Sequence, residues 1–155
     1  MSVSVNEIAL TRNRSNSFEK YEPLLYKIAT NLDFSDKESY DLMYQVKLHV
    51  INHCFNSNLY GFKTWCLKIM VHKCIFRISQ NIISRHRFPE PRPRVLGYPR
   101  TSVTDIHDLY LSLRVVYVLK KIIKVDDIGI AEILNTTPIE VKKKFDRAIS
   151  FLNNR

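Results

Sequence analysis

The chain has 155 residues, 45% of them hydrophobic, and its 24 Lys and Arg against 15 Asp and Glu give a net charge of +9. This composition fits a soluble protein with one ordinary core or two small helical modules. It excludes a membrane-spanning protein, because no apolar run approaches the roughly 18 to 20 residues that a transmembrane helix needs, and the first residues lack the apolar core of a secretory signal. We therefore expect a cytoplasmic protein that does not contact a membrane.

The first half of the sequence predicts a helical domain over residues 18–84. Only three glycines occur in the whole chain, and apolar residues recur at three- and four-residue spacing, which favours helix over strand. Residues 1–17, rich in Ser, Asn and Arg, are expected to be disordered. Asp36 can cap a helix. Helices are expected over residues 18–32, 36–54 and 62–84.

The segment 85–104 predicts a linker. It contains four prolines, which cannot donate backbone hydrogen bonds and which bias the preceding residues away from helix. It is also strongly basic, with a single acidic residue, Glu90, and an excess of positive charge attracts polyanions. Its basic residues are Arg85, Arg87, Arg92, Arg94 and Arg100. We expect this linker to contact nucleic acid or a separate partner.

The last segment, 105–155, predicts a helix-turn-helix. Helices are expected over residues 106–124, from Asp126 or Asp127 to Leu134, and over residues 138–152. Only Asn135 and Thr136 separate Leu134 from Thr137, and Asn135 tolerates a left-handed conformation. Thr137 and Pro138 have the residue types of an N-cap and a first helical position.

The final helix divides into an inward and an outward face. Val141, Phe145, Ala148 and Leu152 share one face at helical spacing, and basic residues occupy the opposite one. A recognition helix needs this division to reach base edges and phosphates in the major groove. Spacing alone also fits a solvated basic face on a helical hairpin. The candidate DNA contacts are Thr137, Pro138, Ile139, Glu140, Lys142, Lys143, Lys144 and Arg147.

Three stretches of the chain resemble sigma factors of the extracytoplasmic-function type. GIAEILNTTPIEVKKKFDRAISFL resembles the fourth conserved region of these factors. YDLMYQVKLHV and GFKTWCLKIMVHKCI are similar to two motifs of the second region. In the fourth region the matching residues are Ile130, Ala131, Leu134, Thr137, Val141, Lys142, Arg147, Ala148 and Leu152. The order of helical domain, linker and C-terminal helix-turn-helix is also that of a minimal sigma factor.

The resemblance implies an all-α protein of two small domains that is a monomer when free, needs no cofactor and is not an enzyme. The first domain would bind core RNA polymerase and melt the downstream promoter element, and the helix-turn-helix would read the upstream element in double-stranded DNA. The implied polymerase contacts are Asp41, Leu42, Tyr44, Gln45 and Leu48. The implied contacts with melted DNA are Asn56, Asn58, Tyr60, Lys63, Lys68, His72, Lys73 and Arg77.

The chain departs from the family pattern at several positions, which are Gln45, His72, Phe76, Gly129 and Asn135. These departures suggest dependence on a DNA-bound or RNA-guided recruiting protein that compensates for weak promoter reading. An anti-sigma factor is another candidate partner. Two alternatives stay open: a sigma-like regulator that does not direct initiation, and a helix-turn-helix repressor, which would normally form a dimer.

A metal site is a rival interpretation of the histidines and cysteines. His49, His53 and Cys54 are close in sequence, and Cys66, His72 and Cys74 follow. The last three point in different directions on one helix, whereas zinc needs four converging ligands. We expect no metal, and free thiols packed between helices.

Overall fold

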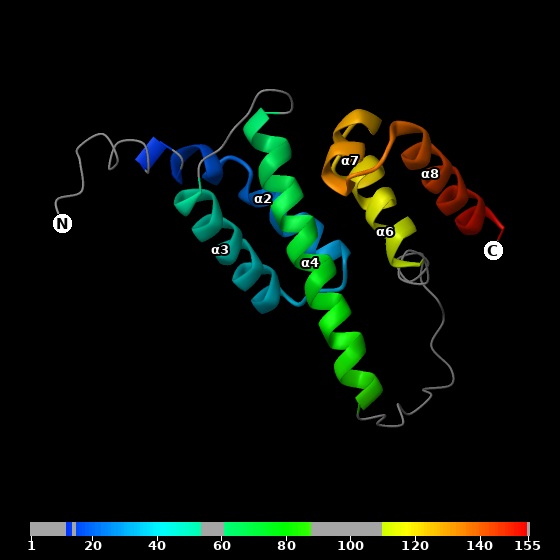
Figure 1. Ribbon diagram of the computed structural model, residues 1–155, viewed down its shortest axis with the longest axis horizontal. Coiled ribbons are helices and arrows are strands. Elements are labelled where there is room, and N and C mark those ends of the chain that lie inside the picture. The colour runs from blue at the N-terminus through cyan, green and yellow to red at the C-terminus, as the bar shows by residue number, and fades with distance from the viewer. Residues whose placement is uncertain (1–11, 14, 54–60, 88–109, 155) are drawn as a thin grey trace.

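The computed structural model describes residues 12–13, 15–53, 61–87 and 110–154, with side chains for all of these except residues 82–87. Every regular element within these ranges is helical (Figure 1). The prediction of an all-α chain is therefore confirmed for the described residues. None of the helices there is both long and apolar enough to span a membrane.

The first predicted helix is broken in two. Residues 15–19 are helical, a turn follows at residues 20–21, and α2 then runs over Glu22–Asn31. The prediction of one helix over residues 18–32 is wrong because Pro23 stands in the first turn of α2. A proline ring has no N–H and clashes with the carbonyl four residues earlier, so Pro23 can begin a helix but cannot continue one.

Helix α3, Asp36–Asn52, begins with a capping box. The Ser35 hydroxyl accepts from the Glu38 backbone N–H at 3.3 Å, and the Glu38 carboxylate accepts from the Ser35 N–H at 2.9 Å. The Ser35 N–H and the Ser35 hydroxyl both donate to the Glu38 carboxylate, and these two bonds hold the pKa of Glu38 below its usual value. The prediction of Asp36 as the cap is wrong, and its carboxylate accepts instead from the Tyr26 hydroxyl.

Helix α4, Gly61–Arg87, is the long central helix, with α2 and α3 on one side and the C-terminal helices on the other (Figure 1). It extends three residues beyond the predicted end because nothing in the sequence breaks it before Pro89, whose preceding residue is biased away from helix. The assignment of Arg85 and Arg87 to the linker is therefore wrong. The other linker residues, Arg92, Arg94 and Arg100, lie outside the described residues.

The C-terminal half consists of α6 (Leu111–Tyr117), a π-helical turn η1 (Val118–Ile122), α7 (Asp127–Leu134) and α8 (Pro138–Asn153). The predicted start of its first helix, residues 106–109, lies outside the described residues, and that helix ends at Ile122 instead of Lys124. The N-caps of α7 and α8 are residues that the sequence predicts as caps. Asp126 accepts from the Gly129 N–H at 2.8 Å, and Thr137 accepts from the Glu140 N–H at 3.3 Å.

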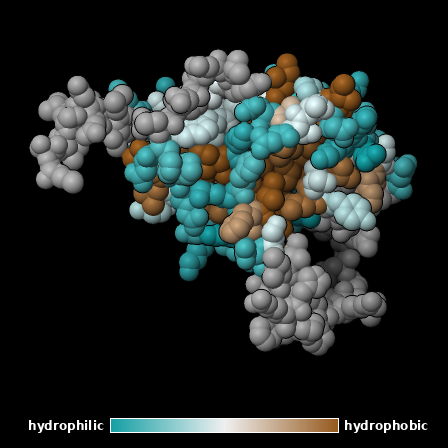
Figure 2. Space-filling view, viewed as in Figure 1, coloured by the Kyte–Doolittle hydropathy of each residue, from teal (hydrophilic) through white to brown (hydrophobic). Residues whose placement is uncertain are grey.

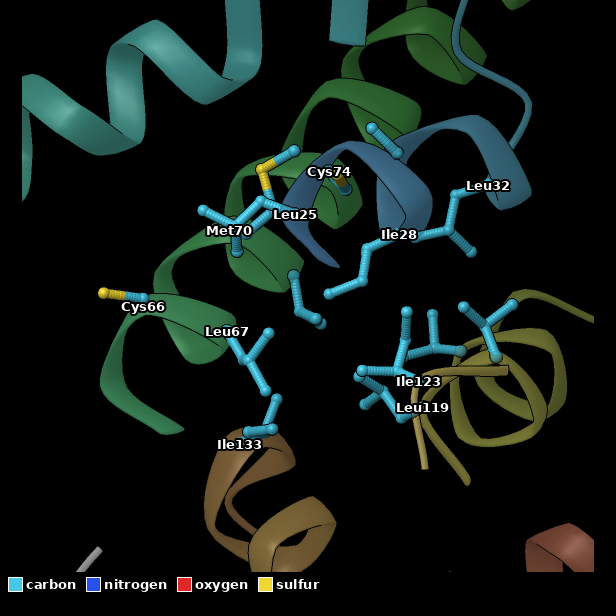
Figure 3. Packing of buried hydrophobic residues seen from close by; sticks show 14 of the residues in the cluster. Leu25, Ile28, Leu32, Cys66, Leu67, Met70, Cys74, Leu119, Ile123 and Ile133 are labelled. Carbon is cyan, nitrogen blue, oxygen red and sulfur yellow. The ribbon is translucent and has the colours of Figure 1, made fainter. Parts of the chain in front are cut away.

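One cluster of buried side chains runs through both halves. Helix α2 contributes Leu25 and Ile28, its C-cap residue Leu32 follows them, and α4 contributes Leu67 and Met70. In Figure 3, Leu119 and Ile123 of the C-terminal half approach α2, and Ile133 approaches Leu67. The buried cluster thus joins the two halves, because the C-terminal helices share one core with α2 and α4.

Candidate nucleic-acid interface

The turn between α7 and α8 is built by a left-handed residue. Asn135 has φ 51° and ψ 48°, as its residue type predicts. The Thr136 N–H donates to the Ala131 carbonyl at 2.9 Å, and the Asn135 N–H donates to the Glu132 carbonyl at 3.4 Å. These two bonds form a Schellman motif, which ends α7 and lets α8 begin two residues later at the Thr137 cap.

The inward face of α8 fixes its orientation. Val141 and Ala148 are fully buried. Phe145 is half-buried, its ring stacks on Tyr117 with centroids 6.2 Å apart, and the Lys120 ammonium lies 4.6 Å from the centre of the same ring. The same ammonium is 2.7 Å from an Asp127 carboxylate oxygen, so one lysine links η1, α7 and α8.

The candidate DNA contacts of α8 lie together on its outer surface. All are exposed except Lys144, which is half-buried. Lys143 pairs with Glu140 across 3.2 Å, and both side chains remain largely in solvent. Ile139, at the second position of α8, is 69% exposed. The outer surface of α8 is therefore polar and mostly basic, with an exposed apolar side chain near its N-terminus.

The candidate strand-binding residues on α4 are not gathered in one open groove. Lys68 donates to Glu132 at 3.3 Å and to the Asn135 side chain at 3.0 Å. The Nε2 of His72 lies 2.8 Å from the Ile133 carbonyl oxygen. Acceptors in α7 and at Asn135, directly after it, therefore hold both side chains against the C-terminal half.

The remaining candidates of this group lie in different surroundings. Lys63 is exposed and Lys73 is half-buried. Arg77 is 2.8 Å from an Asp41 carboxylate oxygen, so it ties α4 to α3. Asn56, Asn58 and Tyr60 lie outside the described residues.

The candidate polymerase-binding residues divide between the core and the surface of α3. Leu42 is 1% exposed and packs in the core, so its assignment to a docking surface is wrong. Asp41 accepts from Gln45 at 3.1 Å and from Arg77, while Tyr44 and Leu48 are exposed. Sequence reasoning missed Tyr40, which is 61% exposed.

Tyr40, Tyr44 and Leu48 form an apolar stripe along α3 at four-residue spacing, opposite the buried Leu42 and Val46. The sequence does contain a signal for this stripe, because its residues form a second apolar set at four-residue spacing that faces away from the core. We call these three residues the α3 stripe.

The histidines and cysteines proposed as rival metal ligands do not converge within the described residues, where no group of three or more such side chains could hold a metal. Cys66 and Cys74 are buried in the core, and burial raises the pKa of each thiol to about 12. His49 and His53 stack at 4.1 Å, and burial lowers the pKa of His49, with smaller contributions from the charges of His53 and Lys73.

Two solved structures resemble the whole fold. The sigma factor RpoE from Bartonella quintana, in complex with the anti-sigma factor NepR, matches with a TM-score of 0.72 at 15% identity, covering 90% of this chain and 93% of that one. This chain has the fold of a sigma factor. CnrH, in complex with the cytosolic domain of CnrY, matches with a TM-score of 0.68 at 15% identity, covering 96% of this chain and 92% of that one. The sequence itself matches no protein-family model and no curated protein.

The sigma fold confirms, at the level of fold, the resemblance that the sequence motifs indicate. It spans both halves of the chain, because each alignment covers at least nine tenths of it. In that fold α7 and α8 correspond to the segment whose sequence resembles the fourth region, and α3 and α4 correspond to the segments that resemble the second.

Proposed function

We propose that this chain is a sigma factor that binds core RNA polymerase and promoter DNA and directs the initiation of transcription. The observation that carries the proposal is the capped, firmly packed helix α8, whose outer surface is basic, on a chain with the sigma fold. In this proposal α8 reads the upstream element and α4 contacts the melted downstream element.

The part played by α8 can be tested by the salt dependence of duplex binding. Each phosphate contact adds about 0.9 to the slope of log K against log salt concentration. We expect Lys143→Ala with Arg147→Ala to flatten that slope by nearly two, and Lys27→Ala, an exposed lysine on α2, to leave it unchanged. Equal slopes in all three proteins would remove α8 from the DNA interface.

The α3 stripe is the surface that we propose for polymerase docking. Exposed aromatic and apolar side chains in a line resemble the anchors of protein interfaces, where truncating one such residue commonly weakens binding about tenfold or more. We expect Tyr44→Ser or Leu48→Ser to weaken the binding of core polymerase by that factor. The matched control is Ile128→Ser on α7, which removes a side chain that is 58% exposed.

A partner that regulates the chain is part of the proposal. RpoE is similar in fold and was crystallised with the anti-sigma factor NepR, which supports an anti-sigma protein as partner here. Co-purification of a bound protein, and its displacement by core polymerase, would test this. If core polymerase and that protein bound together without competition, the partner would be a recruiter instead.

A second candidate function is a sigma-like regulator that binds polymerase without directing initiation. The observation that favours it is the occupation of Lys68 and His72 by α7, because these donors would have to be released before they could hold a melted strand. Tight binding of core polymerase without any promoter-dependent transcript would support the regulator and contradict the sigma factor.

A further inference from the structure

Two helices of this chain begin with the same capping signal, a serine or threonine followed three residues later by glutamate. In α3 the Glu38 carboxylate turns back and accepts from the N–H of the cap residue, Ser35, at 2.9 Å. In α8 the cap residue Thr137 accepts from the Glu140 N–H, but the Glu140 carboxylate is directed to the next turn, where it accepts from Lys143 at 3.2 Å. The Glu140 carboxylate therefore lies along the outer surface of α8 instead of completing its cap.

A carboxylate at this place opposes the binding of DNA unless it has a donor to accept from. The side chains of Glu140 and Lys143 are 48% and 61% exposed, and the exposed Lys142 and Arg147 lie on the same helix. Figure 2 shows hydrophilic residues along α8. On a basic surface that meets phosphates, a negative charge repels the DNA backbone, and removing it from water without a partner costs free energy. Its partner on DNA must be a donor, and phosphates have none.

The place of Glu140 in α8 is that of a residue that reaches base edges. It is the third residue of the helix, and the N-terminal residues of a recognition helix are those that contact bases in the major groove. Arg147 lies two turns further on, about 10 Å along the axis at about 1.5 Å per residue. The buried Val141 and Ala148 fix which side of the helix faces outward. Glu140 is therefore placed to meet a base and Arg147 to meet the backbone.

The donors that a carboxylate can meet in the major groove belong to two bases. Guanine and thymine present acceptors there, whereas cytosine presents its N4 amino group and adenine its N6 amino group. The amino group of adenine lies beside the N7 acceptor, which repels a carboxylate, and cytosine has no such neighbour. Glutamate therefore selects cytosine. Glutamine, which both donates and accepts, pairs with N6 and N7 of adenine.

We propose that Glu140 is a specificity-determining residue of α8, which accepts a hydrogen bond from the N4 amino group of a cytosine in the upstream element. This rests on the proposed function, in which α8 reads that element. Lys143 is its positioning residue. An ammonium has three donors, so Lys143 can hold the Glu140 carboxylate and contact a phosphate at the same time. Since the pair is exposed and therefore weak, the carboxylate can turn to the base when DNA arrives.

The test selects DNA duplexes from a randomised pool with the full chain, in the presence and in the absence of core polymerase, and sequences the bound fraction. For the parent chain we expect one position at which cytosine is preferred over each other base by about tenfold. Glu140→Gln should move the preference at that position to adenine and leave the other positions unchanged. Glu140→Ala should lose the preference and, because a negative charge is gone, bind the remaining duplexes more tightly than the parent chain does.

Asp146→Asn is the matched control, because it removes one negative charge from another exposed position of α8. It should tighten the binding of all duplexes and leave cytosine preferred. The role of Lys143 has its own control. Lys143→Ala should reduce the preference for cytosine as well as the affinity, and Lys143→Arg, which keeps the charge and the donors, should restore both.

Three results would overturn the proposal: a parent chain with no cytosine preference at any position, a preferred base that Glu140→Gln leaves unchanged, or the same change of base in Asp146→Asn. The outcome is separate from that of the proposed function. If Glu140→Gln exchanges cytosine for adenine but no promoter-dependent transcript forms, only the proposed function fails. If transcription depends on an upstream element whose preferred bases Glu140→Gln does not alter, only the role of Glu140 fails.

Discussion

Gly129, at the third position of α7, should resist replacement even by alanine. A Cβ at this position would lie 2.8 Å from the Asp126 Oδ1 and 2.8 Å from the Val125 Cγ1, both too close for a carbon atom. The Asp126 oxygen is also the cap acceptor of the Gly129 N–H. It cannot move away without loss of the cap, and the β-branched valine has little rotamer freedom.

The expected change in the free energy of unfolding is the sum of one stabilising and two destabilising contributions. Alanine gains about 1 kcal/mol over glycine in helix propensity. Loss of the cap costs about 1 kcal/mol, and overpacking beside Val125 costs about 1–3 kcal/mol. We therefore expect Gly129→Ala to lower the free energy of unfolding by about 1–3 kcal/mol. The glutamate that sigma factors usually have at the matching place should cost more, because its side chain is larger.

Urea unfolding followed by circular dichroism measures the effect, with Asp126→Ala as the partner in a double-mutant cycle. In the Asp126→Ala background the cap is already lost, so Gly129→Ala should cost about 1 kcal/mol less than in the parent chain. If Gly129→Ala raised the stability of the parent chain, or cost the same in both backgrounds, the close approach would not be what keeps glycine there.

Three further predictions test the left-handed turn, the buried thiols and the half-buried His49. Asn135→Ala should cost about 1–2 kcal/mol because alanine is strained in the left-handed region, and Asn135→Gly should cost less; equal urea midpoints would contradict this. In a Cys54→Ser variant, Cys66 and Cys74 should react with iodoacetamide at pH 8 only when urea is added, because burial raises their pKa to about 12; fast labelling of the native protein would refute it. Because burial lowers the pKa of His49, the imidazole binds a proton more readily in the unfolded chain than in the folded one. The free energy of unfolding should therefore fall as the pH drops below about 6.5, and His49→Gln should flatten that fall between about pH 7.5 and 5.5. An equal fall in the parent chain and the variant would contradict this.

The features that could be predicted from the sequence depend on local chemistry. The left-handed Asn135, the Thr137 cap and Pro138 at the start of α8 follow from residue types at fixed spacing, and the structure has all three. Two predictions of helix boundaries are wrong, although in each case the residues nearby contain the correct signal. Pro23 divides the first helix, and Ser35 with Glu38 caps α3 in place of Asp36.

The features that could not be predicted depend on contacts between distant segments. Lys68 and Glu132 are 64 residues apart, and no periodicity of either helix indicates that α7 covers that face of α4. The family motif places Leu42 on the docking surface, whereas helical spacing alone places it in the buried set of α3. Helical spacing tells which side chains face inward, but the choice of partner helix comes only from the packed structure.

The central claim is that this chain gives core RNA polymerase a promoter preference. Run-off transcription with core polymerase on a library of templates with randomised upstream and downstream elements tests it most directly. The account predicts transcripts only when the chain is added, from templates that share an enriched upstream element, with the enrichment weakened by Lys143→Ala and Arg147→Ala. Tight binding of core polymerase with no enriched template would contradict it.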